Sequence, residues 1–211
     1  GRFDIISACP DALIETTGSL STITDSNGKS TSDGDPFDLA QQLLKPLLPL
    51  DNTAANYPFV GGLIGYFGYD LGRRLIAIEN RAGAVTKLPD MRIGRYLWAL
   101  IIDHSARQCQ LVFHSNCSEE LRTDIIQRYQ NNTETSTAGS VFSLVEKFKA
   151  TLSQEQYQQA IRSIKDYIGS GDCYQTNFTQ HFSAAFEGDL WEAYKALRAK
   201  APSPYSAFWQ W

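Results

Sequence analysis

The sequence lacks long apolar runs, blocks of like charge and an initiating methionine. Its longest apolar stretches, such as residues 97–102, are far shorter than the roughly 20 residues that a membrane-spanning helix needs. No charged-then-apolar segment opens the chain in the way a secretion signal would. We therefore expect a cytoplasmic protein that does not span a membrane.

The sequence also lacks a cluster of charges of one sign. The chain carries 19 Lys and Arg against 23 Asp and Glu, a net charge of −4, with both signs dispersed along its length. Binding to nucleic-acid phosphates would call for a clustered basic surface. Nucleic acid is therefore not an expected partner.

Cysteine and histidine patterns exclude several kinds of site. The four cysteines form no CxxC pair and no metal-ligand spacing with histidine, so we expect buried free thiols; they are Cys9, Cys109, Cys117 and Cys173. His104 in a turn and His114 near a strand end are expected to face solvent. With no GxSxG elbow in the sequence, a hydrolytic triad is unsupported.

What the chain does contain is enough apolar sequence for a substantial core, at 43% of 211 residues. Residues 205–211 alternate as a strand would, with Tyr205, Ala207, Trp209 and Trp211 on one face. An apolar strand of this kind invites aggregation unless something covers it. We therefore expect that further polypeptide covers it and that both ends of the chain are cut.

The first two thirds of the sequence alternate between strand and turn signals. We predict strands at residues 3–6, 13–23, 93–103 and 108–114, the last two joined as a hairpin. A turn is predicted at residues 25–28, and residues 131–140 read as a loop and local boundary. Helices are predicted from Pro36 to Leu44, capped by Asp35, and from Ser118 to Gln130.

The glycine-rich segment at residues 59–70 favours a strand whose backbone is closely approached by a neighbour. That neighbour is either another chain segment or a ligand. A phosphate loop is disfavoured because no Lys-Ser or Lys-Thr pair follows the glycines. Asp70 is expected to cap a short helix through Leu71 and Leu75.

The last third has the clearest helix signals. Ser153 with Gln156 forms a capping-box pattern ahead of apolar residues at helical spacing, and Asp189 with Glu192 repeats it. Between the two helices, residues 173–186 alternate as a strand with a polar face made of Gln175, Asn177, Thr179 and His181. That face either meets water or lines a buried contact with another sheet or a ligand.

Several segments, in order along almost the whole chain, resemble component I of the chorismate-using synthases, the family of aminodeoxychorismate (para-aminobenzoate) synthase and anthranilate synthase. They are residues 61–74, 88–91, 98–104, 171–180, 188–191 and 201–208. Asn177 and the pair Ala201-Pro202 lean towards the para-aminobenzoate branch. His181 stands where the family usually has arginine, which removes a fixed guanidinium from that position.

The resemblance implies a fold and a domain order. The expected fold class is mixed α/β (α+β), layered, with mainly antiparallel sheets and outer helices. Residues 1–140 would be the N-terminal region of component I. Residues 141–211 would be the start of the chorismate-binding region, which is truncated here.

The resemblance also implies an activity. The full enzyme would bind chorismate with Mg²⁺, take ammonia from a glutamine amidotransferase subunit and form 4-amino-4-deoxychorismate for folate biosynthesis. The magnesium and catalytic motifs of the family come later in its sequence, so this chain alone is expected to be inactive. Alternatives are anthranilate synthase component I, of tryptophan biosynthesis, and a non-catalytic domain that binds tryptophan or docks a subunit.

The same resemblance assigns one ligand site. The family's tryptophan pocket uses a Ser-Pro-Tyr-Ser-like segment, which places Pro204, Tyr205 and Ser206 as candidate binding residues. A proline-fixed turn with aromatic neighbours is compatible with an amino-acid ligand. The alternative is that Pro202 and Pro204 only end the preceding helix.

Overall fold

A computed structural model describes residues 1–48, 55–74, 76, 88–131 and 140–210. The chain divides into two compact units, Gly1–Thr133 and Glu134–Trp211. The loop expected at residues 131–140 lies mostly outside the described residues. The division expected after residue 140 rests on family motifs and stays a prediction.

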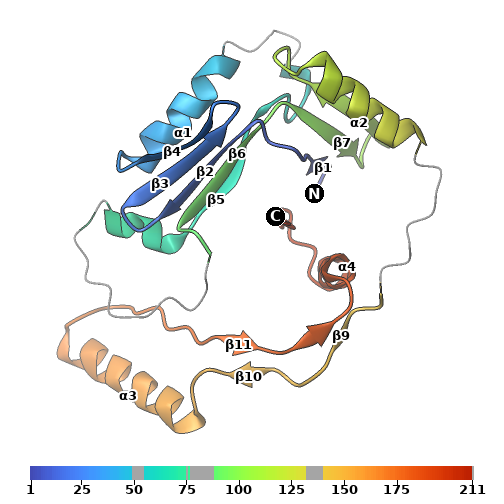
Figure 1. Ribbon diagram of the computed structural model, residues 1–211. Coiled ribbons are helices and arrows are strands. Elements are labelled where there is room, and N and C mark those ends of the chain that lie inside the picture. Colours follow the sequence, from blue (N-terminus) through green and yellow to red (C-terminus); the bar gives the residue numbers. More distant parts are fainter. Residues whose placement is uncertain (49–54, 75, 77–87, 132–139, 211) are drawn as a thin grey trace. The chain divides into compact units, whose positions relative to one another are not determined.

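Five antiparallel strands form the larger sheet of the first unit, in the order β4-β3-β2-β6-β5 (Figure 1). The strands are β2 (Ala12–Thr17), β3 (Leu20–Asp25), β4 (Gly28–Ser32), β5 (Gly62–Phe67) and β6 (Met91–Tyr96). The turn predicted at residues 25–28 is confirmed and joins β3 to β4. The single strand expected at residues 13–23 is wrong, because Gly18, with a φ of 56°, reverses the chain between β2 and β3.

Helix α1 (Pro36–Leu44) covers one face of this sheet, as predicted. The Asp35 carboxylate accepts a hydrogen bond from the backbone N–H of Phe37, which caps the helix, and the 3₁₀ helix η1 (Lys45–Leu47) follows. The buried core between α1 and this sheet consists of Ile14, Ala40, Leu71, Met91 and Ile93. Alternate residues of β2 and β6 thus supply the buried face.

A smaller antiparallel sheet of the first unit has the order β1-β7-β8. It contains β1 (Phe3–Ile6), β7 (Trp98–Asp103) and β8 (Gln108–Phe113), and the predicted hairpin between β7 and β8 is confirmed. The continuous strand expected at residues 93–103 is wrong. Buried Leu97 separates β6 from β7 and packs with Leu47 and Cys117, so the chain passes there from the larger sheet to the smaller one.

Helix α2 (Glu119–Asn131) follows β8, as predicted. Its Ile125 is buried, and its Tyr129 ring meets the Trp98 ring of β7 edge-on with centroids 6.4 Å apart. This aromatic contact joins α2 to the smaller sheet.

The glycine-rich segment forms β5 and the 3₁₀ helix η3 (Tyr69–Arg74). A Cβ on Gly65 would lie 2.3 Å from the carbonyl oxygen of Arg92, so the close neighbour is the backbone of β6. Tight backbone packing is therefore confirmed. Asp70 as a helix cap is wrong: it lies inside η3 and its carboxylate accepts a hydrogen bond from Arg73 Nε at 2.9 Å. Leu75 lies outside the described residues.

The second unit contains both predicted helices, α3 (Gln154–Ser170) and α4 (Leu190–Lys200). Ser153 and Gln156 form the reciprocal capping box, and Gly171 ends α3 in the left-handed conformation with a φ of 83°. Asp189 caps α4 by accepting from Trp191 N–H, whereas the Glu192 carboxylate contacts Lys195 Nζ at 2.8 Å.

The strand expected at residues 173–186 is mostly wrong. Only its end is paired: β11 (Phe182–Ser183) with β10 (Lys149–Ala150), and β12 (Phe186–Glu187) with β9 (Ser143–Leu144). Residues 175–181 are irregular, because alternation alone forms no ladder without a neighbouring strand. The strand expected at residues 205–211 is also wrong for residues 205–210, and Trp211 lies outside the described residues.

Candidate functional site

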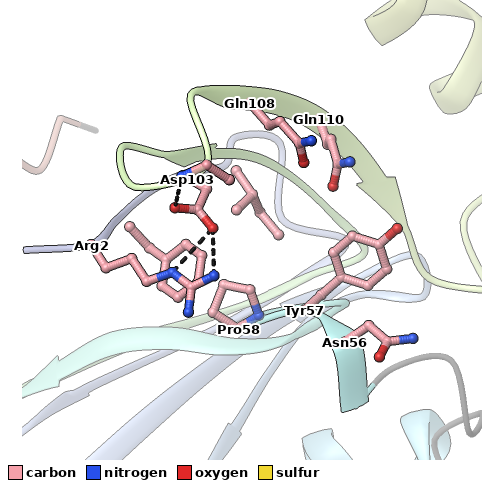
Figure 2. Close-up of a pocket in the computed structure, with 10 residues that line it drawn as sticks. Arg2, Asn56, Tyr57, Pro58, Asp103, Gln108 and Gln110 are labelled. Carbon is pink, nitrogen blue, oxygen red and sulfur yellow. Dashed lines mark hydrogen bonds and ion pairs between the residues drawn. The ribbon is translucent and has the colours of Figure 1, made fainter.

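A cavity of about 290 Å³ opens in the first unit between the β7–β8 hairpin, β1 and residues 56–58 (Figure 2). Its lining residues are Arg2, Phe3, Asn56, Tyr57, Pro58, Ile101, Asp103, Ala106, Gln108 and Gln110. Figure 2 shows the Tyr57 ring and the Asn56, Gln108 and Gln110 carboxamides to one side of the Arg2–Asp103 pair. The antiparallel pairing of β1 with β7, which sets Phe3 opposite Asp103, brings the two ends of this site together.

One ion pair dominates the electrostatics of this cavity. Arg2 Nε and Nη2 donate to Asp103 Oδ2 at 3.1 and 2.8 Å. The other oxygen, Oδ1, accepts the backbone N–H groups of Ser105 and Ala106 at 2.9 and 3.0 Å. The Arg2 hydrogen bond, with help from these N–H groups, lowers the pKa of Asp103 from 3.8 to about 2.

The arrangement is suited to binding and not to catalysis. Asp103 is ionised near neutral pH and already paired, so it cannot serve as a general acid or as a free base. The carboxamides can both donate and accept hydrogen bonds to a polar ligand. Sequence reasoning missed Arg2 and Asp103, since only the β1–β7 pairing, at a separation of about a hundred residues, reveals that they meet.

The predicted ligand residues Pro204, Tyr205 and Ser206 lie on an irregular, exposed segment after α4. The Tyr205 side chain is 95% exposed. The structure describes no hydrogen bond or ring contact that brings the three residues together as a pocket. Their role in binding tryptophan stays a prediction.

An aromatic cluster lies next to this segment. The Phe208 ring lies 5.3 Å from the Trp191 ring and 5.4 Å from the Tyr194 ring, centroid to centroid. These contacts tie the irregular segment back onto α4. The alternation of residues 205–211 does not predict this packing of Phe208, because it singles out Tyr205, Ala207, Trp209 and Trp211.

The polar row of Gln175, Asn177, Thr179 and His181 is exposed. The adjacent Gln180 differs, because its Oε1 is shielded from solvent and has no hydrogen-bond partner among the described residues. Buried side-chain oxygens without partners are rare in folded proteins. Of the two readings of the polar row, the exposed side chains favour contact with water.

The expectation for the histidines is half right. His104 is exposed, with Nε2 2.9 Å from Asp4 Oδ2. His114 is only 7% exposed, so a solvent-facing role is wrong. Its Nδ1 accepts the Asn116 N–H at 3.0 Å, which leaves Nε2 to donate to the Leu47 carbonyl at 3.3 Å. Two backbone partners make His114 a structural residue.

All four cysteines are free, as expected, but only Cys117 is buried. Burial raises the pKa of the Cys117 thiol, which makes it less reactive. Cys9 and Cys109 are exposed, so a buried position is wrong for both. Cys9 has a left-handed backbone conformation with a φ of 54°, and Cys109 lies on the edge strand β8. Cysteine spacing in the sequence predicts neither location.

The described residues do not fit a magnesium site. They contain no group of three or more His, Cys, Asp or Glu side chains placed to hold a metal ion. Mg²⁺ prefers several oxygen ligands in octahedral geometry. In the same described ranges, no helix has the length and apolar character needed to cross a membrane.

Comparison with solved structures finds a protein with the same fold. Anthranilate synthase component I from Streptococcus pneumoniae TIGR4 superimposes with a TM-score of 0.83 at 24% identity, covering 99% of this chain and 48% of that one. The expected fold class, mixed α/β with layered antiparallel sheets, is thereby confirmed.

Sequence relatives carry the comparison further. Aminodeoxychorismate synthase component 1 of Klebsiella aerogenes is 39% identical over 207 residues, and that of Escherichia coli (strain K12) is 34% identical over 209. Each match covers 98% of this chain but 44% of the relative, so the chain spans less than half their length. Anthranilate synthase alpha subunit 1 of Oryza sativa subsp. japonica is 27% identical over 235 residues.

A family model, described as chorismate binding enzyme, matches residues 5–211. The match spans both compact units and agrees with the resemblance seen in the sequence motifs. The chain belongs to the chorismate binding enzyme family.

Proposed function

We propose that this chain is part of an aminodeoxychorismate synthase component 1. In the reaction, the ring hydroxyl of chorismate is replaced by an amino group from ammonia; a C–O bond breaks, a C–N bond forms and water leaves. The observation that carries the proposal is 39% identity to the Klebsiella aerogenes component 1 across 98% of this chain.

A second candidate, anthranilate synthase component I, has the support of the fold match and of relatives at 24–27% identity. The aminodeoxychorismate relatives from enteric bacteria are 33–39% identical. Higher identity over the same residues favours the first candidate. A third possibility is a non-catalytic domain that binds tryptophan or docks a subunit.

The partners and cofactor belong to the proposal as well. A glutamine amidotransferase subunit would supply the ammonia, the name component 1 of the relatives being consistent with a multi-component enzyme. Mg²⁺ would neutralise the carboxylates of chorismate, through ligands that the described residues do not provide. The setting would be folate biosynthesis in the cytoplasm.

The decisive experiment measures product identity. The chain alone, mixed with chorismate, Mg²⁺ and ammonium, should give no aminodeoxychorismate; turnover would disprove its expected inactivity. The same assay is then run with the chain co-expressed with the part of the Klebsiella aerogenes component 1 that it does not match. We expect aminodeoxychorismate by mass spectrometry, whereas anthranilate would favour the second candidate.

Titration with tryptophan tests the predicted ligand residues. Calorimetry on the co-expressed pair should show tryptophan binding, with an affinity that Tyr205→Ala lowers by roughly tenfold, since an aromatic contact contributes about 1 kcal/mol or more. Tyr174→Ala is the matched control, because Tyr174 is likewise exposed. A flat trace for the unsubstituted pair would remove tryptophan from the proposal.

A further inference from the structure

Two pairs in which Asn or Asp precedes glycine lie at the two ends of strand β4, and their surroundings differ. Asn27-Gly28 lies in the turn between β3 and β4, and Asp33-Gly34 follows β4. In such a pair the backbone nitrogen of the glycine can attack the side-chain carbonyl carbon of the residue before it. Glycine favours this attack because it has no side chain to crowd the nitrogen. The contacts around each pair therefore decide whether it reacts.

The contacts around Asn27-Gly28 do not oppose the attack. Both residues are exposed, and a Cβ placed on Gly28 would have no heavy atom of a more distant residue within 4 Å. The Asp25 carboxylate accepts the Asn27 backbone N–H at 2.8 Å, but the Asn27 side-chain amide has no hydrogen-bond partner among the residues that the structure describes. The ladder pair of Gly28 with Asp25 is the first of an exposed edge strand, and such a pair opens at little cost in free energy.

The Asp33-Gly34 pair is held from two sides. The Gly34 N–H donates to Ser32 Oγ at 3.1 Å, so the nitrogen that would attack is engaged. Arg74 Nη2 donates to the carbonyl oxygens of Asp33 and Gly34 at 2.8 and 2.9 Å, which fixes the backbone around the pair. A carboxylate is also a poorer target than a carboxamide, because it has no ammonia to lose. We therefore expect this pair to stay unmodified.

Asn116 is another exposed asparagine of the first unit, and its contacts also oppose the attack. Its side-chain Nδ2 donates to the Pro46 carbonyl at 3.0 Å, so the group that would leave is held. The nitrogen that follows belongs to buried Cys117, whose N–H donates to the His114 carbonyl at 2.9 Å. Hydrogen bonds thus restrain both reacting groups at Asn116, in contrast to Asn27.

We propose that Asn27 and Gly28 form a self-modification site, at which the chain converts Asn27 to aspartate and isoaspartate without another protein. The Gly28 nitrogen gives up its proton and bonds to Asn27 Cγ, the bond from Cγ to the side-chain nitrogen breaks, and ammonia leaves with that proton. Water then opens the resulting five-membered succinimide at either carbonyl. Both reacting groups are in adjacent residues, so the reaction depends neither on the arrangement of the two units nor on the proposed function.

The two products change the β3–β4 hairpin in different ways. Aspartate adds one negative charge to the net charge of −4, close in the chain to the Asp25 carboxylate. Isoaspartate also routes the backbone through the side chain, which inserts a methylene ahead of Gly28 and shifts β4 against β3, where Thr24 pairs with Lys29. No residue of β4 is buried, so the core is not involved. The modified chain should stay folded with a loosened sheet edge.

Incubation of the 211-residue chain, followed by peptide mapping with mass spectrometry, tests the site. We expect residue 27 to convert ahead of Asn116, with release of ammonia and with both aspartate and isoaspartate peptides. The rate should rise with pH, because the attacking nitrogen has to lose its proton. Asn27→Gln should remove the new acidic species seen by ion exchange, since a glutamine side chain would have to form a six-membered ring, which closes less readily.

Asp33→Asn is the matched variant, because it places a second Asn-Gly pair at the other end of β4. Residue 33 should convert roughly tenfold more slowly than residue 27, since the hydrogen bonds from Arg74 and to Ser32 have to break first. Adding Arg74→Ala should raise the rate at residue 33, and Ser32→Ala, which releases the attacking N–H alone, is the milder alternative. Circular dichroism checks that each variant is folded.

Three results would overturn the proposal. The first is an intact residue 27 in a chain whose Asn116 has already converted. The second is equal conversion of residues 27 and 33 in the folded Asp33→Asn chain, which would mean that the contacts around the pairs do not control the reaction. The third is an unchanged yield of acidic species from Asn27→Gln, which would place the modification elsewhere.

Discussion

Isoleucines of the two units have different surroundings. Ile14 of β2 is 1% exposed beneath α1, whereas Ile168 of α3 is 44% exposed on a helix with an equally clear apolar face. The first unit completes its core from its own strands and helices. The second has well-formed caps and helices, yet none of its described residues, 140–210, is buried. Local signals can therefore specify helices without a buried core around them.

The largest expected effect comes from isoleucine truncation in each unit. Ile14→Ala should lower the free energy of unfolding by about 3 kcal/mol, because a cavity forms in a closed core. Ile164→Ala in the second unit should lower it by about 1 kcal/mol or less, since its side chain is only half-buried. Urea denaturation followed by circular dichroism measures both. Equal losses would break the comparison.

A pair of glycines sharpens the contrast. Gly65→Ala should destabilise the first unit by about 2 kcal/mol, because the new Cβ would lie 2.3 Å from the Arg92 carbonyl oxygen and 2.6 Å from Ile93 Cα. Gly169→Ala in α3 meets nothing within 4 Å and should stabilise the helix by about 0.5–1 kcal/mol. Thermal unfolding of the two variants should shift in opposite directions. A gain from Gly65→Ala would show that the β5–β6 contact relaxes freely.

Substitutions at the α3 cap test how much local hydrogen bonds contribute to helix stability in the second unit. Ser153→Ala removes the side-chain acceptor for Gln156 N–H and should reduce helix stability by about 1 kcal/mol. Ser153→Asp supplies another acceptor and should restore most of it. Helicity by circular dichroism against temperature reports both. No difference between the two variants would mean that tertiary contacts, not the cap, fix this end.

The smallest effect concerns the acid range. The pKa of Asp103 is lowered to about 2 from 3.8, so its contribution favours the folded state above about pH 4 and is lost as the pH falls towards 2. Asp103→Asn should therefore show a weaker fall in Tm between about pH 4 and pH 2 than the unsubstituted chain. Asp124→Asn, in an exposed helical pair with Arg128, is the control. Parallel curves for Asp103→Asn and the unsubstituted chain would exclude the ion pair as a source of acid sensitivity.

The sequence predicted those elements whose determinants are local. The caps at Asp35, Ser153 and Asp189 and the turn at residues 25–28 each depend on side chains within a few residues, and all four are found. Residues 93–103 gave no local sign that they serve two sheets. Strand pairing between distant segments decides that split.

Individual side-chain and backbone contacts also differ in whether the sequence predicts them. Tight packing at Gly65 could be predicted because glycine itself marks a close approach. The Arg2–Asp103 pair could not, since its members are 101 residues apart in the sequence and each resembles an ordinary surface charge. The burial of His114 could not be predicted, because both of its hydrogen-bond partners are backbone groups and residue types do not indicate them.

Leu97 has a consequence for how this sequence can change over evolution. It is the single residue between β6 and β7, and side chains along a strand point alternately to opposite faces. Inserting or deleting one residue there would turn every β7 side chain to the other side and force β1 and β8 out of register with it. At this junction, the spacing between the strands is therefore under tighter constraint than the identity of the side chain. Substitutions should be tolerated there more readily than any change in length.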